Sequence, residues 1–506
     1  MSGRSWSSQA IEQRKQRNRQ ARKQLRQRQK AAGLERVSVP AMPNRKSDYT
    51  TVEKEQAARQ DSIIEQHRVI KQHLPFLLDR LSEIADVRNP KKIKHQLDAL
   101  IFFGILMFVY QVESRREANR TMSRPMFMEN LQLLFPALDS FPHQDTLNRL
   151  LSNIDVDKIE QLHIELVQRL IRQKKFVRYL LDNCYPIAID GTQKLVRSEL
   201  VSEQWLERKI NKSEGEQKQY YVYVLEANLV FHNGMVIPLA SEFLDYTQGD
   251  TNNEKQDCET RAFRRLAARL KREFPRLPIM VLLDGLYPNG PIMEICRKNN
   301  WQFMIVLQDK SLPSVWEEYN GLKQLEPENY LKHSWGNRRQ VFRWINGIEY
   351  VYGPNQRKRQ KVHVVVCEES WEEICQDSGQ TETKTSRHAW VSSKPLNKSN
   401  LHERCNLGAR HRWGIETGIL VEKRHGYQYE HCFSHNWNAM RGYHYLMRLG
   451  HLFNVLAHYC VALAKTVRAL GARGFVRFVR ETMAGPWLIA QEVRQRMAAP
   501  FQLRLE

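Results

Sequence analysis

Residues 186–191 read Pro-Ile-Ala-Ile-Asp-Gly, a short apolar run that ends in Asp-Gly where a helical pattern changes to a strand pattern. Residues 278–285, Pro-Ile-Met-Val-Leu-Leu-Asp-Gly, repeat the same ending further along the chain. Short apolar runs bounded by turn residues are typical of buried strands. The two stretches therefore predict two buried strands, which end at Asp190 and Asp284.

The segments around these strands predict an α/β core. Two further β-prone runs are joined by Asn233-Gly234, which is a strong hairpin-turn signal. The expected additional elements are strands over 220–231, 235–244 and 303–307 and helices over 254–273 and 291–299. A ribonuclease-H-like fold has this same order of elements: three antiparallel strands, then a helix, a strand, a helix and a strand. The predicted fold class is an α/β ribonuclease-H-like core interrupted by a mainly β insertion, with helical N-terminal and C-terminal domains.

The pattern along the chain predicts five parts. Residues 1–52 are a basic arm and linker that we expect to be disordered, since residues 11–30 hold nine Lys or Arg and one acid. The arm either orders on nucleic acid or is a solubilising tail. The other parts are a helical N-terminal domain (53–182), the core (183–310 and 401–436), a β-rich insertion (311–400) and a helical C-terminal domain (437–506). The N-terminal domain either binds DNA ends or serves only in packing.

Composition narrows the class of protein. The 506 residues include 78 Lys or Arg against 56 Asp or Glu, a net charge of +22, and 42% are hydrophobic. This rules out wholesale disorder and indicates a polyanionic partner such as nucleic acid, the alternative being a basic protein without one. The longest apolar run, residues 99–110, is too short to cross a bilayer. The eight cysteines never fall at a C-x2–4-C spacing, which argues against a zinc finger.

Three carboxylates are the candidate catalytic and metal-binding residues: Asp190, Asp284 and Glu416. Taken singly, an Asp-Gly after a strand is a common turn, and a lone helical glutamate is usually solvated. The predicted fold brings all three to one end of the sheet. Hard oxygen ligands there would hold two Mg²⁺ ions for in-line phosphoryl transfer, with Mn²⁺ as a substitute.

The helix that carries Glu416 also places two cations beside it. Arg412, Glu416 and Lys423 are separated by four and seven residues, so they fall within about 40° on one helical face. Glu422 falls on a different side and is the weaker candidate. Arg412 and Lys423 are candidate DNA-binding residues that hold the phosphates around the scissile bond. The alternative is an ordinary surface ladder of charges.

In these motifs the chain resembles DDE-class bacterial insertion-sequence transposases, whose ribonuclease-H-like core is interrupted by a β insertion. Such proteins show a Tyr-x2-Arg-x3-Glu-x6-Lys motif around the last acid. Arg412, Glu416 and Lys423 fit its spacing, while the tyrosine position holds Ala409. The stretches 425–431 and 436–440 also resemble members of this group, and the resemblance covers about residues 90–460.

The resemblance implies a function. It implies a transposase that binds the terminal inverted repeats of an insertion sequence and performs metal-dependent strand cleavage and strand transfer. The implied partners are double-stranded DNA, both transposon ends and target, and a second copy of the chain as a homodimer in the DNA complex. The implied location is the bacterial cytoplasm, associated with DNA and with no membrane.

The insertion carries further candidate DNA-binding residues. Members of the resembled group often steady a flipped base on an insertion-domain tryptophan, and stacking offsets the cost of unstacking the base. The candidates here are Trp335 and Trp344, near Arg338, Arg339 and Arg343. For either tryptophan, the competing expectation is a role as a core residue, which is the more common case. The run Arg357, Lys358 and Arg359 is a phosphate contact or a solvated loop.

Two rival functions remain open at the level of sequence. One is a catalytically retired, transposase-derived DNA-binding protein, against which the three intact carboxylates argue. The other is a structure-specific ribonuclease-H-like nuclease, against which the basic arm and the helical flanks argue because they favour the recognition of DNA ends.

Overall fold

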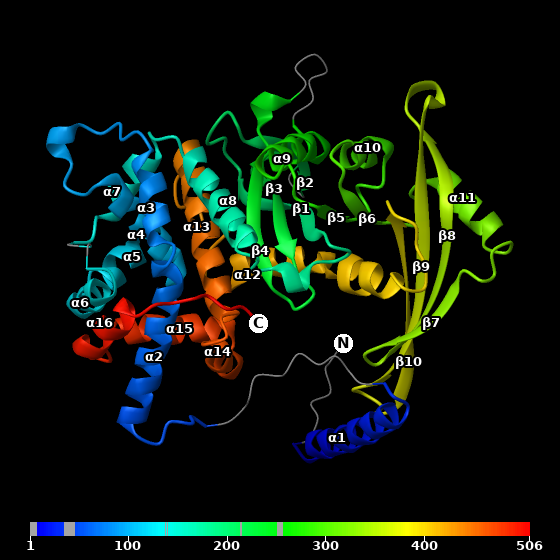
Figure 1. Ribbon diagram of the computed structural model, residues 1–506, viewed down its shortest axis with the longest axis horizontal. Coiled ribbons are helices and arrows are strands. Elements are labelled where there is room, and N and C mark those ends of the chain that lie inside the picture. Colours follow the sequence, from blue (N-terminus) through cyan, green and yellow to red (C-terminus); the bar gives the residue numbers. More distant parts are fainter. Residues whose placement is uncertain (1–7, 35–45, 137, 139, 213–214, 250–256) are drawn as a thin grey trace. The chain divides into compact units, whose positions relative to one another are not determined.

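The computed structural model describes residues 8–34, 46–136, 138, 140–212, 215–249 and 257–506 (Figure 1). The chain forms two compact units, each described by itself below. The helical unit comprises residues 42–277 and 411–506, and the insertion unit comprises residues 1–41 and 278–410. Of the core that the sequence predicts, residues 183–277 and 411–436 fall in the helical unit, and residues 278–310 and 401–410 fall in the insertion unit. Asp190 and Glu416 belong to the helical unit, whereas Asp284 belongs to the insertion unit.

The helical unit contains the helical segments that the sequence predicts at both ends of the chain. Its flanking α-helices are α2 (Val52–Lys71), α3 (Leu74–Ser82), α4 (Leu97–Val109), α5 (Arg115–Met122), α6 (Pro125–Leu134), α7 (Gln144–Leu151), α8 (Asp157–Arg172), α13 (Trp437–His458), α14 (Ala464–Leu470), α15 (Ala472–Met483) and α16 (Ala490–Ala498). Helix α4 is buried on almost every side, which explains its continuous apolar run.

Helix α13 is the central helix of this unit, and it packs against α2, α4, α7, α8 and β4 (Figure 1). Its contact with α4 depends on small residues. A Cβ atom at Gly450 would lie 2.6 Å from the Cβ of Phe108, closer than two such atoms can approach. Glycine at position 450 therefore sets the distance between the two helices.

The sheet of the helical unit is antiparallel. Its strands are β1 (Tyr185–Arg197), β2 (Leu206–Lys212), β3 (Gly215–Val230) and β4 (Val236–Phe243). Strand β3 pairs with the other three. The predicted hairpin between β3 and β4 is confirmed: Gly234 has φ +88° and the Met235 amide donates to Asn233 Oδ1. The sequence does not predict β2, because that strand is mostly polar.

Two helices cover opposite faces of this sheet. Helix α9 (Glu259–Glu273) presents Glu259 to Tyr223, and α12 (Trp413–Arg424) presents Gly418 to Asn228. Because Tyr223 and Asn228 are five residues apart on β3, their side chains point to opposite faces. The predicted helix around Glu416 is thus confirmed as α12, and it lies on one face of the sheet.

The insertion unit combines a short parallel pair with long antiparallel strands. Its elements are α1 (Ser8–Ala31), β5 (Ile279–Leu283), α10 (Gly290–Lys298), β6 (Gln302–Val306), α11 (Pro313–Leu322), β7 (Tyr330–Trp335), β8 (Arg338–Tyr352), β9 (Lys358–Ile374) and β10 (Thr381–Ser392). Strands β5 and β6 are parallel, and the order across the sheet is β5-β6-β10-β9-β8-β7. Residues 311–400 contain helix α11 and the strands β7 to β10.

Both units together make the protein a mixed α/β protein with many helices, as the sequence predicts. The ribonuclease-H-like arrangement remains a prediction. The basic arm differs from expectation, since residues 8–31 form helix α1 instead of a disordered segment. Within the described part of the chain, none of the helices has the length and apolarity that a membrane span requires.

Candidate active site

Helix α12 lies unusually close to the sheet of the helical unit. A Cβ atom at Gly414 would lie 3.3 Å from Val230, and one at Gly418 would lie 3.0 Å from Val236 Cγ1. These glycines are one turn apart, so they form a flat strip along the helix. The strip explains how the backbone that carries Glu416 is held against β3 and β4.

The three motif residues of α12 have different surroundings. Arg412 precedes the helix and pairs with Glu416, with 2.8 Å between Nη2 and Oε1. Lys423 instead donates to the backbone oxygen of Gln193 on β1 at 3.1 Å and pairs with Glu430 at 3.0 Å. Lys423 thus fastens the C-terminal half of α12 to β1.

Arg412 is an incompletely paired cation. Its side chain is only 8% exposed, whereas that of Glu416 is 39% exposed. Its Nε and Nη1 atoms are buried and have no hydrogen-bond partner among the described residues. A guanidinium with unused donors attracts an anion that presents two oxygens to it, such as a carboxylate or a phosphate. The Arg412–Glu416 pair therefore combines a half-exposed carboxylate with a cation whose hydrogen-bonding capacity is not fully used among the described residues.

Asp190 shares a face of the sheet with α12. It pairs in register with Glu226 on β3, and directly paired residues point to the same face of a sheet. Glu226 and Asn228 are two residues apart on β3, so they also share a face. Its carboxylate accepts a hydrogen bond from the Gly191 amide at 3.0 Å. A Cβ atom at position 191 would lie 2.3 Å from Glu259 Oε1 and 2.6 Å from the Tyr223 hydroxyl, so a larger residue after Asp190 would displace these side chains. Asp190 and Glu416 thus lie on the same side of this sheet.

Asp284 follows β5 in the insertion unit, as the sequence predicts. Its Oδ1 accepts a hydrogen bond from the Leu286 amide at 2.9 Å, and the side chain is half-buried. A Cβ atom at Gly285 would lie 2.5 Å from the Gln308 side chain, which would have to move to admit a larger residue. Across the described ranges, His, Cys, Asp and Glu form no group of three or more that could hold a metal ion. The predicted metal site of Asp190, Asp284 and Glu416 remains a prediction.

A buried network of charges lies beneath α12, and the sequence does not predict it. Arg448 on α13 bonds Glu422 at 3.2 Å, lies 3.3 Å from Glu226, and donates to Asn228 at 2.6 Å. His451 adds a contact of 2.7 Å to Glu422. Burial alone would raise the pKa of Glu422, but Arg448 and His451 outweigh it and hold that pKa below the usual range. The network joins α12, α13 and β3.

Lys194 extends this network to β1. Its Nζ donates to the Tyr429 backbone oxygen at 2.8 Å and lies 4.3 Å from the centre of the Tyr429 ring. Burial lowers the pKa of Lys194 to about 8, although Glu226 acts in the opposite direction. A sequence signal for the network does exist. His444, Arg448 and His451 recur at helical spacing within an otherwise apolar helix, which indicates buried polar partners.

The two candidate tryptophans of the insertion differ. Trp344 is 3% exposed in the core of the unit, so its ring is not accessible to a base. Trp335 is half-buried, and the Arg410 guanidinium lies 5.2 Å from its ring centre. Arg338 is held by Glu369 at 2.7 Å and lies over Trp371. Of the cations near the tryptophans, Arg339 and Arg343 are exposed.

The run Arg357, Lys358 and Arg359 lies at the turn between β8 and β9 and is exposed. Lys358 pairs with Glu294 on α10 at 2.7 Å, and Arg359 lies 3.6 Å from Glu349. Lys358 therefore has a local structural partner.

Comparison with known families places one segment of the chain. Residues 78–167, from α3 to α8 of the helical unit, match the family described as DDE_Tnp_1-associated. The match indicates a DDE-type transposase family and suggests a transposase-related function. No curated protein matches the chain.

Proposed function

We propose that the protein is a DNA transposase that binds the terminal inverted repeats of an insertion sequence and catalyses metal-dependent strand cleavage and strand transfer. The observation that carries the proposal is the arrangement on α12. There a half-exposed Glu416 lies beside Arg412, whose remaining donors are unpaired among the described residues. The match over residues 78–167 supports the same class of protein.

The proposed metal ligands are Asp190, Asp284 and Glu416. All three are half-buried carboxylates, and each Asp follows or ends a buried run of β-strand that fixes its backbone. Hard carboxylate oxygens fit Mg²⁺ and Mn²⁺ by their chemistry. A pair of bound Mg²⁺ ions would supply the activation of the attacking oxygen and the stabilisation of the leaving oxygen.

The side chains of the protein have separate roles in this proposal. Arg412, which pairs with Glu416 and has no partner for Nε and Nη1 among the described residues, is the proposed contact to a DNA phosphate next to Glu416. Lys423 keeps α12 on β1 through Gln193, and thereby fixes the position of Glu416. In the insertion unit, the accessible ring of Trp335 is the better candidate for stacking on an unpaired base. The partner is double-stranded DNA, bound by a homodimer so that both ends are cut together.

The test is cleavage of a supercoiled donor plasmid that carries the inverted repeats found next to the gene. We expect Mg²⁺-dependent nicks at both ends and strand-transfer products. Asp190→Asn, Asp284→Asn and Glu416→Gln should each lower the rate at least 1,000-fold, because each removes a ligand charge. Glu317→Gln, at an exposed position on α11, should leave the rate unchanged.

The outcome separates the rival functions. Specific binding of the ends without cleavage in any metal would support a retired DNA-binding protein. Cleavage without joined products would support a nuclease. Full activity in Glu416→Gln would refute the site assignment.

A further inference from the structure

Helix α1 has three faces of different composition. At about 100° per residue, its positions sort into three sectors around the axis. One sector is partly or fully buried against the insertion and holds Ala10, Arg14, Asn18, Ala21, Leu25 and Gln29. A second is exposed and basic, with Lys15, Arg19, Arg22, Lys23, Arg26 and Lys30, and we call it the basic ridge. The third is exposed and is mainly polar and uncharged, with Gln13, Gln16, Gln20, Gln24 and Gln27, and it borders Arg17, which donates to the Asp377 backbone oxygen at 3.0 Å.

The buried sector attaches α1 to the tip of the β9–β10 hairpin. Arg14 bonds the Gln376 oxygen at 2.9 Å and pairs with Asp377, and Asn18 donates to the same Gln376 oxygen at 2.8 Å. Gly379 completes the contact because it has φ +70° and because a Cβ there would lie 2.8 Å from Arg17 Nε. The conformation thus favours glycine at the point where α1 approaches, and a larger residue would also displace the Arg17 side chain.

The other end of α1 is attached to the same two strands. Arg28 donates to Thr381 Oγ1 at 3.2 Å, and Gln29 donates to the Glu372 oxygen at 3.5 Å. Leu25 is 7% exposed and provides an apolar anchor between the polar contacts. The helix is therefore held at several points along its length, so that its remaining faces have fixed directions within the insertion unit.

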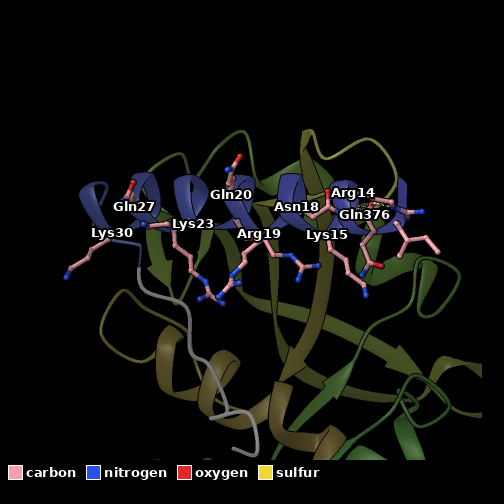
Figure 2. A pocket seen from close by; sticks show the side chains of 12 residues that line it. Arg14, Lys15, Asn18, Arg19, Gln20, Lys23, Gln27, Lys30 and Gln376 are labelled. Carbon is pink, nitrogen blue, oxygen red and sulfur yellow. Dashed lines mark hydrogen bonds between the residues drawn. The ribbon is translucent and has the colours of Figure 1, made fainter. Parts of the chain in front are cut away.

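The basic ridge has no acid between Lys15 and Lys30, and the one acid of the same sector, Glu12, precedes it and lies 4.0 Å from Lys15 Nζ. Figure 2 shows Lys15, Arg19 and Lys23 pointing to one side of α1, and Gln20 and Gln27 pointing to the other. None of the 12 residues that line the groove along α1 is acidic. From Lys15 to Lys30 the ridge extends about 22 Å at 1.5 Å per residue. Each strand of a DNA duplex carries one phosphate per 3.4 Å of axis, so this length faces about six phosphates.

We propose that the basic ridge of α1, held on the β9–β10 hairpin, binds the phosphate backbone of double-stranded DNA without reading its sequence. This inference rests on the proposed function, because it takes DNA as the partner. The number of charges on the ridge and its length match the phosphate spacing of the duplex, and contacts to phosphates carry no sequence information directly. A helix that is already folded and docked avoids the ordering entropy that a flexible basic tail would lose on binding.

The test uses the full chain in EDTA with a labelled 30-bp duplex of mixed sequence that lacks the inverted repeats. Fluorescence anisotropy over 50–300 mM NaCl gives the slope of log affinity against log salt. In the ridge variant the six basic residues become Gln, which keeps a strong helix former at each position. We expect its slope to be shallower by about 3–5, at 0.9 per neutralised phosphate, and its affinity to fall more than 10-fold.

A charge-swapped variant is the matched control. In it, Lys15, Arg19, Arg22, Arg26 and Lys30 become Gln while the five glutamines of the third sector become Arg, so that net charge and helix propensity are kept. The proposal predicts that this variant loses affinity as the ridge variant does. Wild-type affinity and slope in the charge-swapped variant would overturn the proposal, because total charge alone would then explain binding.

These results are distinguishable from failure of the proposed function. Ridge-dependent binding of the duplex, together with no plasmid cleavage under any condition, would support the ridge and contradict the transposase activity. End-specific cleavage by the wild-type chain, together with an unchanged salt slope in the ridge variant, would support the transposase activity and contradict DNA binding by the ridge. No binding of any duplex by the wild-type chain would overturn both.

Discussion

The two sides of helix α12 carry glutamates six residues apart with opposite surroundings. Glu422 faces the sheet, is fully buried, and has Arg448 and His451 as partners. Glu416 faces outward, is 39% exposed, and lies beside Arg412, which keeps unpaired donors among the described residues. A carboxylate in a complete network stabilises the fold, whereas one beside an incompletely paired cation is available to a ligand. The difference between the two sides distinguishes a structural acid from a candidate catalytic one.

The largest effect expected from this comparison is on stability. Glu422→Ala leaves Arg448 buried without its main partner on α12, and breaking a buried pair in this way costs about 3–5 kcal/mol. Glu416→Ala should lower the free energy of unfolding by at most about 1 kcal/mol, because its carboxylate is partly solvated. Urea denaturation of the two variants gives both values. If both variants lost the same free energy of unfolding, Glu422 would not be the more strongly stabilising of the two glutamates.

A second experiment changes the packing of α12 without touching its charges. Gly418→Leu forces the helix away from Val236, and overpacking of this kind costs about 1–3 kcal/mol. Glu416 moves with the helix, so cleavage should fall as well. The matched control is Gly321→Leu on α11, where a Cβ meets nothing within 4 Å. If Gly418→Leu were as stable and as active as the control, the close approach of α12 would be unimportant.

The smallest expected effect is on the pH dependence of stability and concerns His458. Unlike Glu422, this buried side chain lacks a partner, within the described part of the chain, for one of its polar atoms. His458 Nε2 on α13 has no hydrogen-bond partner among the described residues, and burial lowers the pKa of His458 to about 3. The unfolded chain protonates this imidazole below its ordinary pKa near 6.5 and the folded chain does not, so stability falls as the pH drops from 6.5 towards 3.

His458→Phe removes this loss. Its unfolding temperature, relative to the wild-type chain, should therefore be higher at pH 5 than at pH 8. A difference that stays constant between the two pH values would show that His458 is protonated in the folded chain.

Much of the fold follows from local sequence signals. The buried apolar runs predict β1 and β5, and β5 ends at Leu283 just before Asp284-Gly285, as expected. The predicted end of β1 at Asp190 is wrong, because β1 continues through Asp190 and Gly191 to Arg197 and stays paired with the distant strand β3. The hairpin at Asn233-Gly234 follows from the φ value that Gly234 adopts, +88°. The helix of Glu416 follows from the spacing of its charged residues. In each confirmed case the deciding interactions lie within one turn or one strand.

The parts that sequence does not predict depend on distant partners. Glu422 looks like a surface charge, because its partner Arg448 comes from another helix. Helix α1 reads as a solvated arm, because much of its docking is to backbone oxygens such as that of Gln376, which leave no apolar pattern. The burial of Trp344 likewise depends on the strands around it. Neither the candidate metal site nor the ribonuclease-H-like arrangement follows from local signals.

The pairing of α4 with α13 has a consequence for the synthesis of the chain. Helix α4 has almost no polar surface, and its partner is made more than 300 residues later. At about 5–20 residues per second, translation leaves α4 without that partner for roughly 15–70 seconds. During this interval its apolar surface is a binding site for chaperones or for other nascent chains. Production of the folded protein is therefore expected to depend on how fast the ribosome reaches Gly450 and on what shields α4 until then.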